Sequence, residues 1–197
     1  MKLLGTLQKG LVFVVSAPAG TGKTTLVRML TQEFNAVIEN VSFTTRPIRK
    51  GEAEGCDYHF ISEEEFKKRI KEGEFLEYAT VFGHFYGTSR KSVEEKLCCG
   101  KHVALVIDTQ GAMQIKKHLE ATYIFIRPPN LEELKKRLHG RKSETQEAID
   151  TRLSWAEKEI ETAKFYDYLI INENLKMAYE VLRAIFIAEE HRNRLKK

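Results

Sequence analysis

The stretch LVFVVSAPAGTGKTTLVRML, from Leu11 to Leu30, indicates how the chain folds. Its first five residues are all apolar, and a continuous apolar run is typical of a parallel-sheet strand that is buried on both faces. A glycine-rich turn follows, and apolar residues then recur at three- and four-residue spacing, which favours an amphipathic helix from about Lys23. Strand, glycine-rich turn, Gly-Lys-Thr and helix together predict a loop that binds nucleotide phosphates.

The residue types of this loop suit phosphate chemistry. Gly20 and Gly22 lack a Cβ, so backbone N–H groups can curl inward around an anion, and the helix directs the positive end of its dipole at the same point. We expect Lys23 to reach the β- and γ-phosphates and the Thr24 hydroxyl to coordinate Mg²⁺. The strict pattern begins with glycine, whereas this chain has Ala17 there, which requires a negative φ at that residue.

Composition and charge limit the classes of protein to which the chain can belong. The 197 residues are 42% hydrophobic and 30% charged, as in an ordinary globular domain. The longest apolar runs are far shorter than a membrane span, and the three cysteines show neither a disulfide framework nor zinc-site spacing, so we expect a cytoplasmic location. A net charge of +4 suits an anionic small substrate, and it could also suit nucleic acid.

Four apolar runs predict inner strands of one parallel sheet, because three of them are followed by helical patterns. These runs are Leu11–Val15, Val103–Ile107, Tyr123–Ile126 and Tyr168–Ile171, and helical stripes span Asn130–His139, Thr145–Ala163 and Leu175–Phe186. Residues from about 42 to 101 break the alternation with short strands, a polar loop and two helices that begin after Ser62 and Ser89. We therefore predict an α/β fold, a parallel sheet flanked by helices, with a small mixed-strand insert between the first two of these strands.

Motifs at several places narrow the function. Arg46 and Arg49 lie in Thr44-Thr45-Arg46-Pro47-Ile48-Arg49-Lys50-Gly51-Glu52 and offer planar guanidinium donors suited to a phosphate, although paired loop arginines are commonly only solvated. Further motifs are Gly55-Cys56-Asp57-Tyr58-His59-Phe60, Phe75-Leu76-Glu77-Tyr78-Ala79, Tyr86-Gly87-Thr88-Ser89, Ile107-Asp108-Thr109-Gln110-Gly111-Ala112, Leu138-His139-Gly140-Arg141 and Tyr166-Asp167-Tyr168-Leu169-Ile170-Ile171-Asn172. With these motifs in order, the chain resembles the guanylate kinase family from about residue 10 to residue 190.

The resemblance implies reversible phosphoryl transfer from MgATP to GMP, and to dGMP, giving ADP and the nucleoside diphosphate for purine nucleotide recycling and GTP supply. It also implies a P-loop NTPase-type fold in three parts. The core would comprise residues 10–41, 102–134 and 164–197, a GMP-binding insert residues 42–101, and a helical lid residues from about 135 to 163.

Site residues follow from the resemblance, position by position. Its contacts to the GMP phosphate fall on Arg46, Arg49, Tyr58 and Tyr86, and its contacts to guanine fall on Ser42, Glu77, Thr88 and Asp108. The catalytic positions are Lys23, Arg137, Arg141 and Arg152. The ATP contacts are Ala17, Pro18, Ala19, Gly20, Thr21, Gly22, Lys23, Thr24, Thr25 and Asn172, with Mg²⁺ at Thr24.

The chemistry of these residue types agrees with the implied reaction. An ionised Glu77 can only accept hydrogen bonds, which matches the N1–H and amino donors of guanine, and the hydroxyls of Ser42 and Thr88 can donate to its acceptors. From spacing alone, however, Glu77 would be a surface carboxylate on a strand. The GMP phosphate is largely dianionic at pH 7 and is its own nucleophile, so cations rather than a general base are required.

Four positions depart from the family pattern. Val106 stands where a carboxylate is usual, two residues before Asp108, and this loss affects the ordering of water around Mg²⁺. Ala19 replaces the usual loop serine, Asn40 stands where serine is common, and Arg127 occupies a position that is usually apolar.

Two other functions are open from the sequence. Guanylate-kinase-like domains also occur as scaffold parts that bind phosphopeptides without catalysis, but Gly22-Lys23-Thr24, Arg137 and Arg141 argue against that function here. The basic tail from His191 could bind nucleic acid, although a solvated helix end is the simpler interpretation, since charges of both signs are mixed elsewhere. We therefore expect ATP and GMP as partners, and neither a membrane nor a specific nucleic acid.

Overall fold

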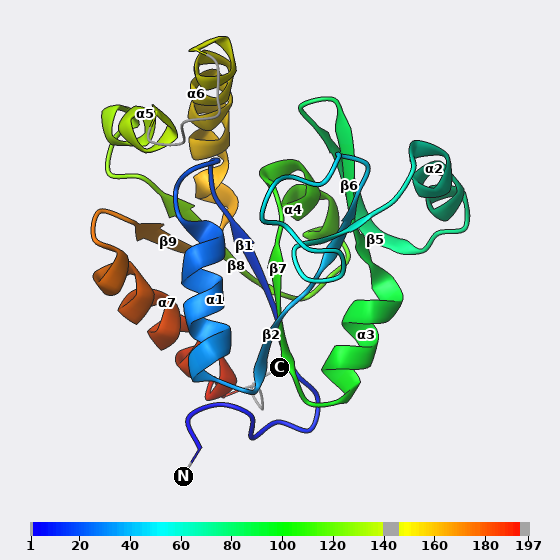
Figure 1. Ribbon diagram of the computed structural model, residues 1–197. Helices are drawn as coiled ribbons and strands as arrows, with labels where there is room; N and C mark the ends of the chain where they lie inside the picture. Colours follow the sequence, from blue (N-terminus) through cyan, green and yellow to red (C-terminus); the bar gives the residue numbers. More distant parts are fainter. Residues whose placement is uncertain (1, 140–145, 194–197) are drawn as a thin grey trace.

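A computed structural model of the protein describes residues 2–139 and 146–193 (Figure 1). Its larger sheet has five strands in the order β2-β7-β1-β8-β9, and every neighbouring pair is parallel. Helices cover both faces of this sheet, as the sequence predicts for repeated strand–helix units. The strands are β1 (Val12–Ser16), β2 (Val37–Glu39), β7 (His102–Val106), β8 (Thr122–Arg127) and β9 (Tyr168–Ile171), and the covering helices are α1 (Lys23–Glu33), α3 (Arg90–Cys98), α4 (Thr109–Ile115) and α7 (Leu175–Glu190).

The central strand β1 is buried at each of its five residues, because it separates two hydrophobic layers. Phe13 and Val15 pack into the layer of α1 and α7, and Phe13 stacks on Phe186 with a centroid distance of 3.6 Å. Val12 and Val14 pack into the opposite layer, with residues of α3 and α4. A strand that is apolar on both faces reads as one continuous apolar run, which is why the sequence reveals it.

The smaller sheet corresponds to the predicted mixed-strand insert. Its strand order is β4-β3-β6-β5, in which β3 and β4 are parallel and the other pairs are antiparallel. The predicted N-caps are confirmed: the hydroxyl of Ser62 accepts from Glu65 N at 3.1 Å, and that of Ser89 accepts from Ser92 N at 3.3 Å. The elements are β3 (Ser42–Thr44), β4 (Tyr58–Phe60), α2 (Glu63–Lys71), β5 (Phe75–Val81) and β6 (His84–Ser89).

All four predicted inner strands are present, but the sequence did not reveal β2 or α4. A three-residue strand and a seven-residue helix are too short to show a clear hydrophobic period. The predicted helix over Thr145–Ala163 is confirmed as α6 (Gln146–Glu161) followed by a 3₁₀ turn (Thr162–Phe165), and α5 (Leu131–His139) precedes it. No helix in the described part of the chain is long and apolar enough to cross a membrane.

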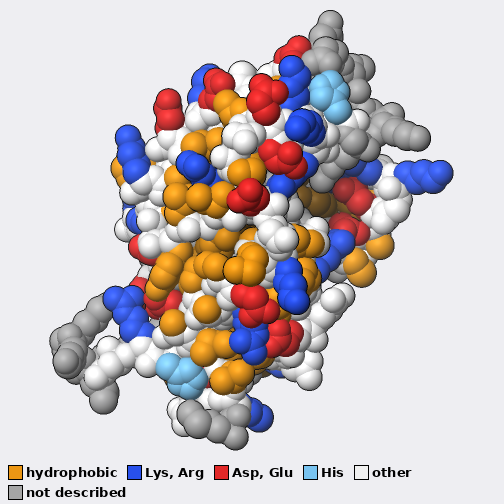
Figure 2. All heavy atoms as spheres, turned by 90° about the vertical axis from the view of Figure 1, so that its left-hand side faces the viewer, with side chains coloured by type: hydrophobic (Ala, Val, Ile, Leu, Met, Phe, Trp, Pro, Cys, Tyr) orange, Lys and Arg blue, Asp and Glu red, His pale blue; other side chains and the backbone are white. Residues whose placement is uncertain are grey.

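Apolar side chains gather on the side of the molecule where β9 and α7 lie (Figure 2). Leu169 and Ile171 on the edge strand β9 are about half exposed, as is Val181 on α7, and Met177 on the same helix is more exposed still. The same strand buries Ile170 in the core, so only the alternate residues of β9 contribute to this surface.

Glu190, near the end of α7, ties the first residues of the described chain to the core. Its carboxylate accepts from Gly5 N and Thr6 N, each at 2.7 Å, and also contacts the Thr6 hydroxyl and His102 Nε2. Leu11 N donates to His102 Nδ1 at 3.1 Å, so a neutral imidazole carries its proton on Nε2 and donates it to Glu190. Burial alone would raise the pKa of Glu190, but the hydrogen bonds from Thr6, Gly5 and His102 lower it to about 2.

Glu190→Gln should therefore destabilise the fold by about 2–3 kcal/mol at neutral pH, because the buried His102 and the partly buried N–H groups of Gly5 and Thr6 lose a charged acceptor. The folded-state pKa lies below the unfolded value, so this contribution is present above the unfolded pKa and is lost as pH falls from about 4.5 to about 2. Thermal unfolding at pH 7 and pH 3 measures both effects, with Glu180→Gln on the exposed side of α7 as the control. Equal unfolding temperatures for the two variants at pH 7 would contradict this role of Glu190.

Candidate active site

A cleft of about 430 Å³ lies at the carboxyl end of β1 and is lined by residues of both sheets. Carboxyl ends of parallel strands are the usual place for ligands in α/β folds, because the loops that follow neighbouring strands meet there. Most residues predicted to bind nucleotide line this one cleft. They are Ala17, Pro18, Ala19, Gly20, Gly22, Lys23, Thr24 and Thr25 from the loop and α1, Ser42, Arg46, Arg49, Tyr58, Glu77 and Tyr86 from residues 42–86, and Asp108 and Arg152.

The loop between β1 and α1 has a backbone that requires glycine. Gly22, the N-cap of α1, has φ of 95°, and a Cβ there would lie 2.8 Å from Asn172 Nδ2. That amide donates to Thr21 O at 2.7 Å, so Asn172, the residue directly after β9, supports the loop. The N-cap residue Gly22 has no side chain with which to cap α1, which leaves the first N–H groups of the helix available to an anion. Among residues 2–139 and 146–193 the one non-glycine with positive φ is Phe82, so Ala17 has the negative φ predicted for it.

Lys23 begins α1 and reaches the neighbouring strand end, where its Nζ donates to Ile107 O at 3.3 Å. Burial lowers the pKa of this ammonium, and the carboxylates of Glu159, Asp108 and Glu39 oppose that effect. Burial also raises the pKa of Glu39, and it raises that of Glu159 to about 7. An anion bound beside Lys23 would favour its charged form.

Glu77 lies deep in the second half of the cleft, with only 4% of its surface exposed. It accepts a hydrogen bond from the Thr88 hydroxyl at 2.5 Å, and a Cβ on Gly111 would collide with its Oε2. Burial raises its pKa to about 7; the Thr88 bond opposes this rise and the charge of Asp108 adds to it. Asp108 itself caps α4 by accepting from Gly111 N at 2.9 Å. This pocket therefore offers buried acceptors to a ligand that carries hydrogen-bond donors.

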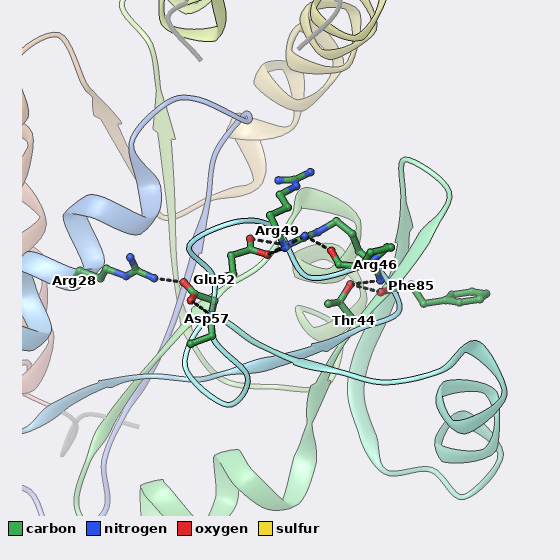
Figure 3. A network of polar contacts seen from close by, with 9 residues as sticks. Arg28, Thr44, Arg46, Arg49, Glu52, Asp57 and Phe85 are labelled. Atoms are coloured by element: carbon green, nitrogen blue, oxygen red, sulfur yellow. Dashed lines mark hydrogen bonds and ion pairs between the residues drawn. The ribbon is translucent and has the colours of Figure 1, made fainter. Parts of the chain in front are cut away.

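Arg46 is held in place by the loop that follows it (Figure 3). Its guanidinium donates to both carboxylate oxygens of Glu52, at 2.8 and 3.0 Å, and to Pro47 O at 2.7 Å. Arg49 N also donates to Glu52, at 2.8 Å, but the Arg49 guanidinium points away from that carboxylate (Figure 3). A 2.5 Å ion pair between Asp57 and Arg28 ties the same loop to α1. Glu52 thus organises one fixed and one extended cation at the cleft.

Four predicted site residues lie elsewhere. Thr88 is buried behind Glu77, and Thr21, Arg137 and Asn172 line a separate hollow of about 300 Å³ beside the phosphate loop. There Arg137 donates to Asn172 O at 3.0 Å and to Glu133 at 3.1 Å, so it does not reach the main cleft in this arrangement. Arg141 lies outside the described residues.

Several residues line the cleft without having been predicted there, including Glu39, Glu159, Phe82 and Trp155. A signal for part of this set exists in the sequence. Arg152, Trp155 and Glu159 recur at three- and four-residue spacing, which places them on one face of α6. The apolar stripe on the same helix predicts packing, and on its other face the sequence predicts a function for Arg152 alone.

A glycine-rich loop between a buried strand and a helix, with lysine and threonines at the helix start, defines a P-loop nucleotide-binding fold. The arginines that face this loop across the cleft are typical of phosphoryl-transfer enzymes of this class.

Comparison with known proteins places the chain within that class. The family model described as guanylate kinase matches residues 9–189, and the chain belongs to the guanylate kinase family. It is 57% identical over 192 residues to the guanylate kinase of Protochlamydia amoebophila (strain UWE25), covering 98% of each chain, and 50% identical over 183 residues to that of Chlamydia pneumoniae, covering 92% of this chain and 89% of the relative.

A solved structure agrees with this assignment. The crystal structure of guanylate kinase from Anaplasma phagocytophilum superposes with a TM-score of 0.79 at 36% identity, covering 94% of this chain and 88% of that one. The resemblance and the α/β fold predicted from the sequence are therefore confirmed.

Proposed function

We propose that this protein transfers the γ-phosphoryl group of ATP to GMP, giving ADP and GDP. One observation carries the proposal: a single cleft is lined on one side by Lys23 in the phosphate loop and on the other by Glu77 with Arg46 and Arg49. The first set suits the phosphates of a donor nucleotide, and the second suits an acceptor with a phosphate and a base rich in donors.

The three-part organisation expected from the sequence belongs to this proposal. Residues 42–101 would bind GMP, residues from about 135 to 163 would form a lid, and the remaining residues from 10 onward would form the core. The smaller sheet and its own helix α2 support a separate binding part, and the position of α5 and α6 at the open end of the larger sheet supports a lid (Figure 1).

Each half of the cleft would hold one nucleotide. We assign the GMP phosphate to Arg46, Arg49, Tyr58 and Tyr86; the two tyrosine rings lie edge to face with centroids 5.7 Å apart, and the Arg46 guanidinium lies 5.4 Å from the Tyr58 ring. Guanine would then lie at Ser42, Glu77 and Asp108, with Thr88 supporting Glu77 from behind. Residues 17–25 would hold the ATP phosphates, and the hollow at Arg137 and Asn172 would hold the rest of ATP.

In the transfer step, an oxygen of the GMP phosphate attacks the γ-phosphorus, and the bond from that phosphorus to the β–γ bridging oxygen breaks. The bridging oxygen leaves with the electron pair, so ADP departs and no proton has to be removed from the nucleophile. Lys23 and Arg152 would stabilise the charge on the transferring group, because both line the cleft between the two half-sites. Arg137 and Arg141 would join them when the lid moves.

Magnesium fits the oxygen donors at the loop. The Thr24 hydroxyl and the carboxylates of Asp108 and Glu39 line the cleft near Lys23, and such ligands suit Mg²⁺. In the described part of the chain, no three His, Cys, Asp or Glu side chains are grouped to hold a metal ion. The ion would therefore bind mainly through nucleotide phosphates and water, where it supplies positive charge. Glu39 lies on β2, next to β7. Its carboxylate would take the place of the one that the family usually has at the position of Val106.

An acceptor panel tests the proposal. MgATP is offered with GMP, dGMP, AMP, UMP or CMP, and ADP formation is measured; turnover is expected with GMP and dGMP only. No turnover with GMP, together with binding of a phosphopeptide, would overturn the enzyme in favour of a scaffold domain. Steeply salt-dependent binding of duplex DNA would instead support the nucleic-acid alternative.

A further inference from the structure

Two aromatic side chains meet across the mouth of the cleft, and the proposed function assigns neither of them a role. Phe82 lies at the tip of the β5–β6 hairpin, Trp155 lies on α6, and their ring centroids are 5.3 Å apart at an interplanar angle of 46°. The hairpin tip and α6 rise on opposite sides of the space above the phosphate loop (Figure 1). Both residues line the cleft, so this contact joins its two walls.

Phe82 occupies a backbone position that disfavours it. Val81 pairs with His84, so Phe82 and Gly83 form a two-residue hairpin loop, and their φ angles are 49° and 80°. Positive φ at both central positions is typical of a type I′ turn, for which Asn-Gly is the preferred pair and an aromatic residue is strained. The ring is also 44% exposed, so it is not held there by burial in the core. Turn formation therefore does not explain this side chain.

The same ring contacts a second residue of α6. The Arg152 guanidinium lies 5.6 Å from the Phe82 centroid, in the range of a cation–π contact. Arg152 and Trp155 are three residues apart on one helix face, so one ring on the hairpin contacts two neighbouring positions of α6. Arg152 is also the cation on α6 that lines the cleft among the described residues.

The hairpin connects Phe82 to the proposed GMP site through short stretches of strand. β5 carries Glu77 five residues before Phe82, and β6 carries Tyr86 four residues after it. The two strands are paired from Val81↔His84 to Glu77↔Thr88, so the tip and the base of the hairpin move as one ladder.

We propose that Phe82 is a positioning residue, which holds the Arg152 guanidinium over the cleft by stacking against it and against Trp155. The inference rests on the proposed function, because it assigns Arg152 to the transferring phosphoryl group. Phe82 would thereby make the placement of a charge-stabilising arginine depend on the hairpin that binds GMP.

Phe82→Asn tests the proposal in a fold that should remain intact, because Asn-Gly is the preferred pair for this turn. We expect kcat for MgATP and GMP to fall about tenfold, since an aromatic pair and a cation–π contact are both lost. The KM for GMP should stay within about twofold, because the contacts to the nucleotide remain. Phe82→Tyr keeps the aromatic ring, so its kcat should equal that of the wild type. Phe165→Asn, at a ring that is 50% exposed and does not line the cleft, is the matched control and should leave kcat unchanged.

Trp155 supplies a direct readout, because it is the single tryptophan of the chain. Its emission should shift to longer wavelength in Phe82→Asn, as the indole gains water, and should stay unchanged in Phe165→Asn. This measurement requires no turnover, so it tests the contact even if the acceptor panel shows no GMP phosphorylation.

A double variant separates positioning from a general structural effect. If Phe82 acts through Arg152, Phe82→Asn combined with Arg152→Lys should lose no more kcat than Arg152→Lys alone. Three results would overturn the proposal: kcat losses that multiply in the double variant, an unchanged kcat in Phe82→Asn, or an unchanged Trp155 emission. A wild-type protein that forms no ADP with GMP would instead overturn the proposed function.

Discussion

Lys23→Ala is expected to lower kcat for MgATP and GMP by about 10²–10³-fold, the usual loss when one group that stabilises transition-state charge is removed. The ammonium lies at the start of α1, within reach of Ile107 O, and faces the carboxylates of Glu159 and Asp108. Without it, phosphoryl groups in the loop would meet these carboxylates with no intervening cation. GMP binding should stay nearly intact, because its proposed contacts lie in residues 42–88 and at Asp108, none of them in the phosphate loop.

Rates of ADP formation and calorimetric titration with GMP measure the two effects separately. Lys67→Ala is a suitable control, since Lys67 lies on the exposed face of α2 and pairs with Glu63. Its kcat should equal that of the wild type. Full activity in Lys23→Ala would overturn the assignment of residues 17–25 to the donor phosphates.

Glu77→Gln is expected to lower kcat/KM for GMP by about 10²-fold while the KM for ATP changes by less than about twofold, because a buried charged acceptor is lost from one half-site only. A glutamine has a single acceptor oxygen and presents an amino group that would face a donor of guanine. Titrations of the wild type and the variant with GMP and with ATP measure the difference. Equal losses for both nucleotides would count against a guanine contact.

The pH dependence provides a second test of Glu77. Its pKa of about 7 in the free protein means that the carboxylate loses its proton between about pH 6 and pH 8, and only the ionised form accepts from both guanine donors. GMP affinity should therefore rise with pH across this window. The GMP phosphate titrates in a similar range, so Glu77→Gln is the control that retains the phosphate effect and loses the rest. An identical pH profile in both proteins would show that Glu77 does not titrate with binding.

The elements visible in the sequence are those whose evidence is local. The phosphate loop combines a buried strand, two glycines and a lysine within a few residues, and the N-caps at Ser62 and Ser89 are set by neighbours three residues away. Short elements such as β2 have no such signature, because three residues do not make a period. The strand β2 forms because it pairs with β7, which lies some 65 residues further along the sequence.

Much of the candidate site could not be predicted from the sequence either, because its residues are brought together by contacts between distant parts of the chain. Spacing alone would place Glu77 on a surface, yet it is buried against Gly111 at the start of α4, a helix that the sequence did not reveal. The guanine contact proposed for it rests on the resemblance to the family and not on spacing. Arg152 was likewise assigned by resemblance, whereas its contact with Phe82 depends on how a hairpin and a distant helix meet.

The hydrogen bonds of Glu190 join the first residues of the described chain to the end of α7. This connection lies at the end of the molecule away from the cleft (Figure 1). Loss of residues 2–6 would leave Glu190 without its Gly5 and Thr6 donors, and loss of the last turn of α7 would leave those donors and His102 without their acceptor. A force on either segment, or a domain fused to it, would strain the hydrogen bonds of Glu190 before it disturbs the nucleotide cleft.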